Sequence, residues 1–416
     1  MRLIRLPAFF VLITGCLLVA GCADMSRLGA VPADVKGGTT VHGMSHVRYW
    51  GDEASAEIID DAVEAYRREV ATFQASGASG DLPLAPFLAI SGGGENGAYG
   101  AGLLVGWTAT GTRPSFKLVT GISTGALTAP FAFLGPAYDA RLQEVYTTLS
   151  AKDVMQPRGL MAVVFEDAFA DNTPLRRTVA KYFDQDMMEA IAAEHAKGRI
   201  LLVATTNLDA RRPTIWNVTK IAASGNPRAL GLIHEVLVAS AAIPGAFPPI
   251  MIDVEVNGQK HQEMHVDGGA SAQVFVYPPS LTRTTEQFST QQRDRERRIY
   301  VIRNARLDPD WATVERATFS ILERAVTSLI QTQGVGDLYR IYLAAQRDRI
   351  DFNLAYIPET FTTPLKEPFE TAYMRSLFEI GRERALKGYQ WAKVPPGYTA
   401  PTIEPPVQTQ PVAPPR

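Results

Sequence analysis

The chain has 416 residues, of which 46% are hydrophobic and 20% charged, and its formal net charge is −2. This length and composition fit one large globular domain or two smaller ones. The nearly neutral balance gives no indication of a nucleic-acid partner. Cys16 and Cys22 are the only cysteines, too few for a disulfide framework or a metal site built of cysteines.

Residues 1–21 have the organisation of a secretory signal peptide. Arg2 and Arg5 give a positive start, and the apolar stretch Pro7–Ala20 follows them. This stretch is shorter than the roughly 20 residues of a transmembrane helix, so a cleaved signal is favoured over an uncleaved anchor, which stays the alternative.

The end of this stretch, Val19-Ala20-Gly21-Cys22, resembles a bacterial lipoprotein box. The resemblance implies that Cys22 becomes the lipid-bearing first residue of the mature protein. Cys16 closes a second candidate box, with a much shorter apolar region before it. By the same resemblance, Ala23 after the cysteine favours the outer membrane, facing the periplasm, in a lipid-anchored protein of the bacterial cell envelope.

Residues 22–84 are expected to form a tether and an N-terminal helix. Residues 24–50 have no clear periodicity and are interpreted as the tether. From Asp52 to Phe73, apolar residues recur at three- and four-residue spacing, which predicts a helix that packs on the core.

The run Gly92-Gly93-Gly94 lies between a predicted strand and a predicted helix. Residues 86–90 are apolar, as in a buried strand, and residues 97–107 have small and apolar residues at helical spacing. Glycines in such a turn leave backbone N–H groups unobstructed at a helix N-terminus, where negative charge is favoured. Gly92, Gly93 and Gly94 are therefore candidates for an oxyanion hole.

Two other interpretations compete for this run. Gly92, Gly94 and Gly97 also spell the dinucleotide-binding G-x-G-x-x-G, which needs an acidic residue about 20 positions further on. No acidic residue occurs between Glu95 and Asp139, so the nucleotide site is disfavoured. The glycines could also serve close helix–strand packing alone.

Gly121-Ile122-Ser123-Thr124-Gly125 matches the G-x-S-x-G pattern of a nucleophilic serine. Residues 117–120 read as a strand and residues 126–129 as the beginning of a helix. This is the context in which the serine hydroxyl is exposed on a strained turn. Ser123 is the predicted nucleophile, and Ser240 is the next candidate.

Asp267 is the candidate base. Residues 251–256 and 260–266 alternate as two strands, and Asn257-Gly258 between them is typical of a tight hairpin turn. Asp267 would then lie at a strand end, followed by two glycines that let another backbone approach. An ordinary turn aspartate is the competing interpretation.

The histidines decide between a dyad and a triad. No histidine follows Asp267, so the order Ser, acid, His of an α/β-hydrolase triad is absent. His195, His234, His261 and His265 precede it and leave a triad in another order open. We favour a dyad, and from it we expect no essential group to titrate near the histidine pKa of about 6.5.

Three features follow Asp267. Residues 299–302 are predicted to form a strand. Residues 311–349 carry apolar residues at helical spacing, for which core packing is favoured over a membrane-contacting face. Residues 395–416 contain eight prolines and little hydrophobic mass, so an extended, disordered tail is expected.

Taken in order, these motifs resemble the patatin-like phospholipase family over roughly residues 85–275. In that family the first motif forms the oxyanion hole, the second carries the nucleophile and the last supplies the dyad aspartate. The residues that carry the resemblance are Ser91–Gly97, Gly121–Gly125, Thr205–Asp209, Ser240–Pro249 and Asp267–Gly269. One position departs from the pattern: Asn96 stands where the family often has Arg or Lys, which puts a phosphate-bearing substrate in doubt.

The resemblance implies a three-layer α/β/α hydrolase domain around a mainly parallel sheet, at residues 85–390, with a proline-rich tail at 391–416. It implies a serine lipid acyl hydrolase that acts on membrane lipids or other lipid esters through a Ser123–Asp267 dyad and an acyl-enzyme. No metal or organic cofactor is expected. The alternatives are a carboxylesterase acting on small or non-phospholipid esters and a non-catalytic lipid-binding envelope protein.

Overall fold

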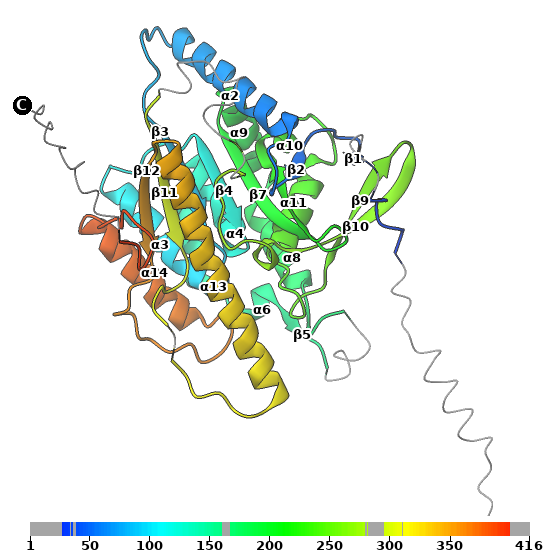
Figure 1. Cartoon of the computed structure of the whole chain (residues 1–416), viewed down its shortest axis with the longest axis vertical. Coiled ribbons are helices and arrows are strands. Elements are labelled where there is room, and N and C mark those ends of the chain that lie inside the picture. The colour runs from blue at the N-terminus through cyan, green and yellow to red at the C-terminus, as the bar shows by residue number, and fades with distance from the viewer. Residues whose placement is uncertain are drawn as a thin grey trace, which may run out of the picture.

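The computed structural model describes residues 27–33, 35, 39–159, 167–278, 281, 295–309 and 311–399. A large, mainly parallel sheet lies between two layers of helices (Figure 1). Five neighbouring strands run parallel, and antiparallel strands extend the sheet beyond β7. The parallel strands, in spatial order, are β12 (Asp351–Tyr356), β11 (Arg297–Arg303), β3 (Ala85–Ile90), β4 (Leu118–Ile122) and β7 (Ile200–Asn207). The antiparallel strands are β10 (Gln259–Asp267), β9 (Ile250–Val256) and β1 (Thr39–Val41), with β8 (Arg212–Asn217) and β2 (Arg48–Trp50) paired in turn to β7.

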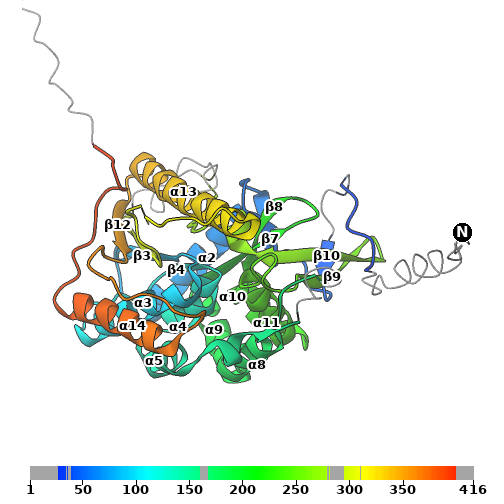
Figure 2. The same cartoon turned by 90° about the horizontal axis from the view of Figure 1, so that it is seen from below.

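The helices divide between the two faces of this sheet, as Figure 2 shows. Helices α2 (Ala56–Ala75) and α13 (Thr318–Arg347) cover one face, where two apolar clusters form. The larger core lies on the other face. The helices there are α3 (Gly97–Ala109), α4 (Thr124–Leu134), α5 (Asp139–Thr148), α6 (Ala151–Val154), α8 (Thr173–Tyr182), α9 (Gln185–Ala196), α10 (Val218–Ala222), α11 (Ala229–Ser240) and α14 (Thr371–Leu386). The three-layer α/β/α architecture predicted from the sequence is confirmed.

The central strands are mostly apolar because helices bury both of their faces. In β3, Leu88 and Ile90 pack into the larger core, whereas Ala89 faces α13. The helix α3 is likewise buried nearly all round, between the sheet and α14. Gly102 allows the close approach of α14, since a Cβ there would overlap the backbone carbonyl of Phe378.

The predicted hairpin is confirmed together with its turn. β9 and β10 pair in antiparallel register, and Asn257 and Gly258 connect them with φ angles of 50° and 78°. Two positive φ angles are what the primed turns of tight hairpins require, and Asn-Gly tolerates both. The hairpin delivers Asp267 to the end of β10, next to β7.

The expected tether does not extend to residue 50. β1 pairs with β9, and β2 pairs with β8, so residues 39–50 belong to the sheet. Before them, Arg27 forms an ion pair with Asp209, and the Leu28 N–H donates to the Gln262 side chain at 3.0 Å. These pairings join residues far apart in the chain, so no local pattern of residues indicates them. Residues 1–26, including the predicted signal and Cys22, lie outside the described residues.

Two expectations for the C-terminal part also need correction. The second half of α13 packs on the sheet through Leu338 and Ile341, but the side chains of its first half are largely exposed. The packed region also passes the predicted boundary at residue 390, because Ala392 pairs with Leu354 and the ring of Tyr398 packs on Tyr342. The rest of the predicted tail, from residue 400, lies outside the described residues.

Candidate active site

Ser123 occupies the sharp turn between β4 and α4. Its φ of 55° and ψ of −126° are unusual for a residue with a side chain, and this strain is characteristic of a serine held out for attack. The flanking glycines make the turn possible, because a Cβ on Gly121 would overlap the Gly125 carbonyl and one on Gly125 would overlap the Ile90 carbonyl. Ser123 is 6% exposed.

Ser240 supports this turn from the end of α11. Its hydroxyl accepts a hydrogen bond from the Ser123 N–H at 3.0 Å and donates to the Ala204 carbonyl oxygen at 2.7 Å. Both of its hydrogen-bonding capacities are thus used by backbone groups. The position fits a supporting residue better than a second nucleophile.

Asp267 lies at the end of β10, held by its own backbone and side chain. Its N–H donates to the Ala242 carbonyl at 2.8 Å, and its Oδ1 accepts from the Gly269 N–H at 2.7 Å. Oδ2 is buried, and no group among the described residues makes a hydrogen bond of ordinary geometry to it. One carboxyl oxygen is therefore fixed, and the other is available.

The electrostatics of Asp267 favour a base. Burial raises its pKa from 3.8 to about 7, while the nearby Ser123 hydroxyl and the Gly269 N–H oppose that rise. The Ser123 hydroxyl thus lies against the carboxyl, although loosely, since it does not complete a standard hydrogen bond to Oδ2. Such contacts are often long without substrate. This pKa corrects our expectation that no essential group of a dyad would titrate near pH 6.5.

The glycine run lies beside the serine, since a Cβ on Gly92 would come within 3.2 Å of the Ser123 Cβ. The Gly92 N–H donates to the backbone carbonyl of Gln273 at 3.1 Å, so it is not free for an oxyanion. Gly93 and Gly94 have φ angles of 151° and 56°, and their N–H groups donate to none of the described residues. Of the three predicted glycines, these two keep available donors.

Gln273 connects the two halves of the site and was not recognised in the sequence. Its carbonyl accepts from Gly92, while its side-chain amide donates to the Gly269 carbonyl at 2.8 Å. Its own N–H donates at 2.6 Å to Asp337, a buried residue of α13. The loop after Asp267, the glycine run and α13 therefore share one buried residue.

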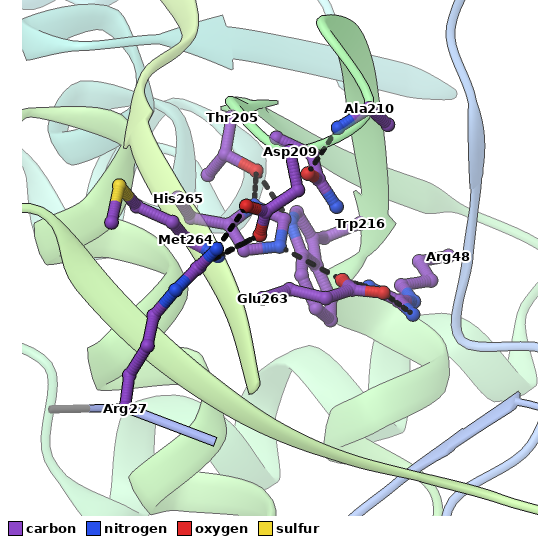
Figure 3. A network of polar contacts seen from close by, with 10 residues as sticks. Arg27, Arg48, Thr205, Asp209, Ala210, Trp216, Glu263, Met264 and His265 are labelled. Carbon is purple, nitrogen blue, oxygen red and sulfur yellow. Dashed lines mark hydrogen bonds and ion pairs between the residues drawn. The ribbon is translucent and has the colours of Figure 1, made fainter. Parts of the chain in front are cut away.

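His265, the histidine nearest to Asp267 in the chain, belongs to a separate buried network (Figure 3). Its Nε2 lies 3.1 Å from Glu263 and its Nδ1 2.9 Å from the Thr205 hydroxyl. The Glu263 carboxylate is ion-paired to Arg48 and can only accept, so Nε2 carries the proton. Nδ1 then accepts from Thr205, which in turn accepts from Trp216 at 2.9 Å. Both ring nitrogens are occupied, which leaves His265 no lone pair for a serine proton.

Charge reinforces this structural role. Burial alone would raise the pKa of Glu263, but the charge of Arg48 and hydrogen bonds from His265 and Arg48 lower it to about 2. Burial lowers the pKa of His265 itself, so its ring is neutral. Asp209, at the other side of the network, holds Arg27 and accepts from the Met264 N–H at 2.9 Å, as Figure 3 also shows.

Two of the other three candidate histidines are bonded elsewhere, and the third, His195, is not joined to the site. The ring nitrogens of His234 and His261 lie next to backbone carbonyls of Phe183 and Ala30, at 2.7 and 3.2 Å. Burial lowers the pKa of His195 to about 4, and no described residue bonds its Nδ1. No described contact joins any of the four to Ser123 or Asp267, so the geometry favours a dyad.

A cleft of about 920 Å³, counting the space that opens to solvent, begins at Ser123 and Gly94. The lining is dominated by apolar side chains of α4, α5, α8 and the end of α11, among them Leu127, Val179 and Phe183. Glu95 is the one charged residue that lines it among the described residues, and burial raises the pKa of Glu95. Such a lining suits an acyl chain.

Asn96, the departure from the family pattern, has a structural partner. Its side-chain oxygen accepts a hydrogen bond from the Tyr373 hydroxyl at 2.7 Å. This bond ties the turn that follows the glycine run to α14. No cation stands at this position.

Comparison with known proteins agrees with this geometry. Residues 88–278 match the family described as patatin-like phospholipase. These residues form a patatin-like phospholipase domain. The match spans Ser123, Asp267 and the glycine run and supports a lipid ester hydrolase. No curated protein sequence is significantly similar to the chain.

Solved structures similar to the chain are distant in sequence. VipD from Legionella pneumophila is 12% identical, with a TM-score of 0.34, and the match covers 75% of this chain and 68% of VipD. ExoU from Pseudomonas aeruginosa is 12% identical, with a TM-score of 0.29 and coverage of 74% and 52%. Human GIVD cytosolic phospholipase A2 is 11% identical, with a TM-score of 0.30 and coverage of 74% and 54%. The chain thus spans about half the length of the last two, and these similarities are too weak to assign an activity.

The described residues contain neither a metal-binding cluster nor a membrane-spanning helix. No group of three or more His, Cys, Asp or Glu side chains is placed to hold a metal ion there. None of the helices in the described ranges has the length and apolar character needed to cross a membrane.

Proposed function

We propose that the protein hydrolyses carboxylic esters of lipids with Ser123 as nucleophile and Asp267 as its base. The observation that carries the proposal is the position of Ser123, strained at the β4–α4 turn between an apolar cleft and a buried carboxyl. A hydroxyl is a poor nucleophile until a base takes its proton. With a pKa of about 7, Asp267 is a stronger base than an ordinary carboxylate and is still largely ionised slightly above neutral pH.

Acylation follows from these positions. The Ser123 oxygen bonds to the ester carbonyl carbon while its proton passes to Asp267 Oδ2, the oxygen with no fixed partner. The N–H groups of Gly93 and Gly94 donate to the oxyanion, and each such donor is typically worth about 3 kcal/mol. The C–O bond of the ester then breaks, and the leaving alkoxide takes the proton from Asp267.

In deacylation, water takes the place of Ser123 as the nucleophile, and Asp267 again acts as the base. Water attacks the acyl-enzyme and gives a proton to Asp267. The bond to the Ser123 oxygen then breaks, the proton returns to Ser123, and a carboxylic acid is released. The N–H of Gly269 holds Oδ1 throughout, so Asp267 keeps its orientation while Oδ2 gains and loses the proton.

A labelling and turnover experiment tests this proposal. The purified protein is treated with a fluorophosphonate probe and, separately, with phosphatidylcholine vesicles and a soluble short-chain ester. We expect labelling and ester hydrolysis, both abolished in Ser123→Ala. Ser240→Ala is the matched control and should still be labelled, because it keeps the nucleophile.

Each other outcome contradicts a part of the proposal. Labelling that persists in Ser123→Ala and is lost in Ser240→Ala would move the nucleophile to Ser240. Hydrolysis of the short-chain ester without any release of fatty acid from vesicles would favour a carboxylesterase. A folded protein that binds vesicles but is neither labelled nor active would be a lipid-binding protein without turnover.

We also propose that Cys22 is lipidated and that the protein is anchored at the outer membrane, facing the periplasm. The lipoprotein-like sequence before Cys22 supports this assignment, as does the absence of any other cysteine besides Cys16. The first described residue, Arg27, is already held against the body by Asp209. Five residues reach at most about 17 Å, so a lipid on Cys22 would keep the catalytic body at the membrane surface.

A further inference from the structure

The first half of α13 presents an apolar face that no described residue covers. Figure 1 shows this half, in yellow, extending beyond the sheet. Its apolar side chains are exposed, with Leu329 at 70%, and Trp311 in the segment before the helix is 94% exposed. The exposed large apolar residues of this region are Trp311, Val314, Ile321, Leu322, Val326, Leu329 and Ile330.

These residues form an ordered face of the helix. At about 100° per residue, the apolar side chains of the first half fall within one arc of about 180°. The members of that arc are Ile321, Leu322, Ala325, Val326, Leu329 and Ile330. The polar residues Glu323, Arg324, Thr327, Ser328 and Gln331 occupy the opposite arc. The first half of α13 is therefore an amphipathic helix by itself.

This face is distinct from the one that packs on the sheet. Leu338, Ile341 and Ala345, in the second half, are buried against β11 and β12. Their mean direction lies about 130° around the helix from that of Leu322, Val326 and Leu329. The exposed apolar face of the first half is thus not a continuation of the apolar face that the second half packs on the sheet. It is turned by roughly a third of a circle from the side that packs on the sheet.

We propose that the amphipathic first half of α13, together with Trp311, docks on a lipid surface. An amphipathic helix of this kind lies in the membrane interface with its apolar face in the acyl boundary, and tryptophan favours the headgroup level. The proposal rests on the lipid substrate proposed above. It is supported by the five-residue separation of Cys22 and Arg27 in the sequence, since a lipid on Cys22 would keep the body within reach of a bilayer.

The position of α13 gives the docking a catalytic consequence. Immediately after the apolar half, Gln333 contacts the Gln273 side chain at 3.2 Å and Asp337 accepts from the Gln273 N–H. Gln273 holds both Gly92 and the loop after Asp267. A lipid surface bound to the first half of α13 would therefore lie next to the elements that hold the catalytic residues.

The charges of this region indicate which surface it fits. Glu315, Arg316, Glu323 and Arg324 sum to zero between residues 311 and 331. A neutral face gains little from anionic headgroups, so we expect docking to depend on apolar burial and to be insensitive to salt. Zwitterionic phosphatidylcholine vesicles are the appropriate probe.

A fluorophore on the helix reports docking directly. The experiment uses the full chain with Cys16→Ser and Cys22→Ser, which removes both native thiols. The apolar N-terminal segment is kept and can still attach the protein to the vesicles. Leu329→Cys is then labelled with an environment-sensitive dye and reconstituted with vesicles that carry a quencher on their acyl chains. We expect a blue shift and loss of fluorescence by quenching. Leu386→Cys on α14, where the native side chain is 44% exposed, is the matched control and should show neither.

Activity provides a second readout. Leu322→Asn combined with Leu329→Asn should weaken hydrolysis of vesicle lipid by roughly tenfold or more, because two apolar side chains that would enter the lipid are lost. Hydrolysis of a soluble short-chain ester should be unchanged. If the parent protein cleaves neither substrate, the proposed function fails, while the quenching result still decides the docking.

Two results would overturn the proposal. A dye on Leu329→Cys that stays in water with vesicles present would show that the face does not meet lipid. The dye could instead be shielded from water without vesicles. If the protein were then a dimer that Leu329→Asn dissociates, the face would be an interface between two copies of the chain.

Discussion

Replacement of Asp267 by asparagine should alter both activity and the pH dependence of stability. The carboxyl has an ordinary pKa of 3.8, and burial raises it to about 7 in the folded protein. A carboxyl whose pKa is raised by folding stabilises the native state at low pH, and that contribution is lost as pH rises through the folded pKa. The shift of about 3 pKa units corresponds to roughly 4 kcal/mol in total, of which about 3 kcal/mol falls between pH 5 and pH 8.5.

Asp267→Asn removes this ionisation and keeps an oxygen that can accept from the Gly269 N–H. We therefore expect the variant to gain about 3 kcal/mol in free energy of unfolding, relative to the unmodified protein, between pH 5 and pH 8.5. Denaturant unfolding of both proteins at the two pH values measures it. Asp253→Asn, with an exposed side chain on the neighbouring strand β9, is the matched control and should show no such gain.

The same ionisation should govern turnover. A base must be deprotonated, so kcat/KM of the unmodified protein should rise with pH and level off above about 7. Asp267→Asn should lose activity by several orders of magnitude, about as far as Ser123→Ala, since the two act as a unit. If the free energy of unfolding of Asp267→Asn differed from that of the unmodified protein by the same amount at every pH, the raised pKa of the buried carboxyl would be refuted. A folded variant of His195, His234, His261 or His265 as inactive as Ser123→Ala would refute the dyad.

Three further predictions concern the support, the cleft and the anchor. Ser240→Ala removes two buried hydrogen bonds and should lower the free energy of unfolding by about 1–3 kcal/mol, measured by denaturant titration, without preventing fluorophosphonate labelling. Val179→Trp should narrow the cleft, so that hydrolysis of long-chain esters falls more than that of short-chain esters in a chain-length series; equal losses would mean that the acyl chain lies elsewhere. Cys22→Ser should abolish incorporation of radioactive palmitate, and labelling that persists would point to Cys16.

Local signals in the sequence predicted the elements that carry the site. Asn257-Gly258 specifies its turn by the φ angles that these residues tolerate, and the Gly121–Gly125 motif specifies a turn that only glycines permit at its ends. Both depend on residues that are neighbours in the chain. The strand ends bearing Ser123 and Asp267 could therefore be assigned before any tertiary contact was known.

Contacts between distant residues could not be assigned in this way. Ser240 and Ser123 are 117 positions apart, and nothing in the motif around Ser240 indicates that its hydroxyl would hold the other serine. The loss of Gly92 as an oxyanion donor depends on Gln273, whose surroundings have no motif. In α13, apolar residues recur at helical spacing in both halves, and the two halves are about equally apolar. This pattern alone does not show that the apolar face of the first half is exposed while that of the second half packs on the sheet.

In the proposed mechanism, the pKa of Asp267 explains how two residues would replace a triad. A triad has a histidine whose proton affinity near neutral pH matches the task of a general base. Here burial shifts a carboxyl into the same range, while one hydrogen bond, from Gly269, fixes its orientation. The cost is a destabilising charge above neutral pH, on a carboxylate whose Oδ2 has no fixed partner and can take the serine proton. The environment of the strand end, rather than a third side chain, would thus supply the base.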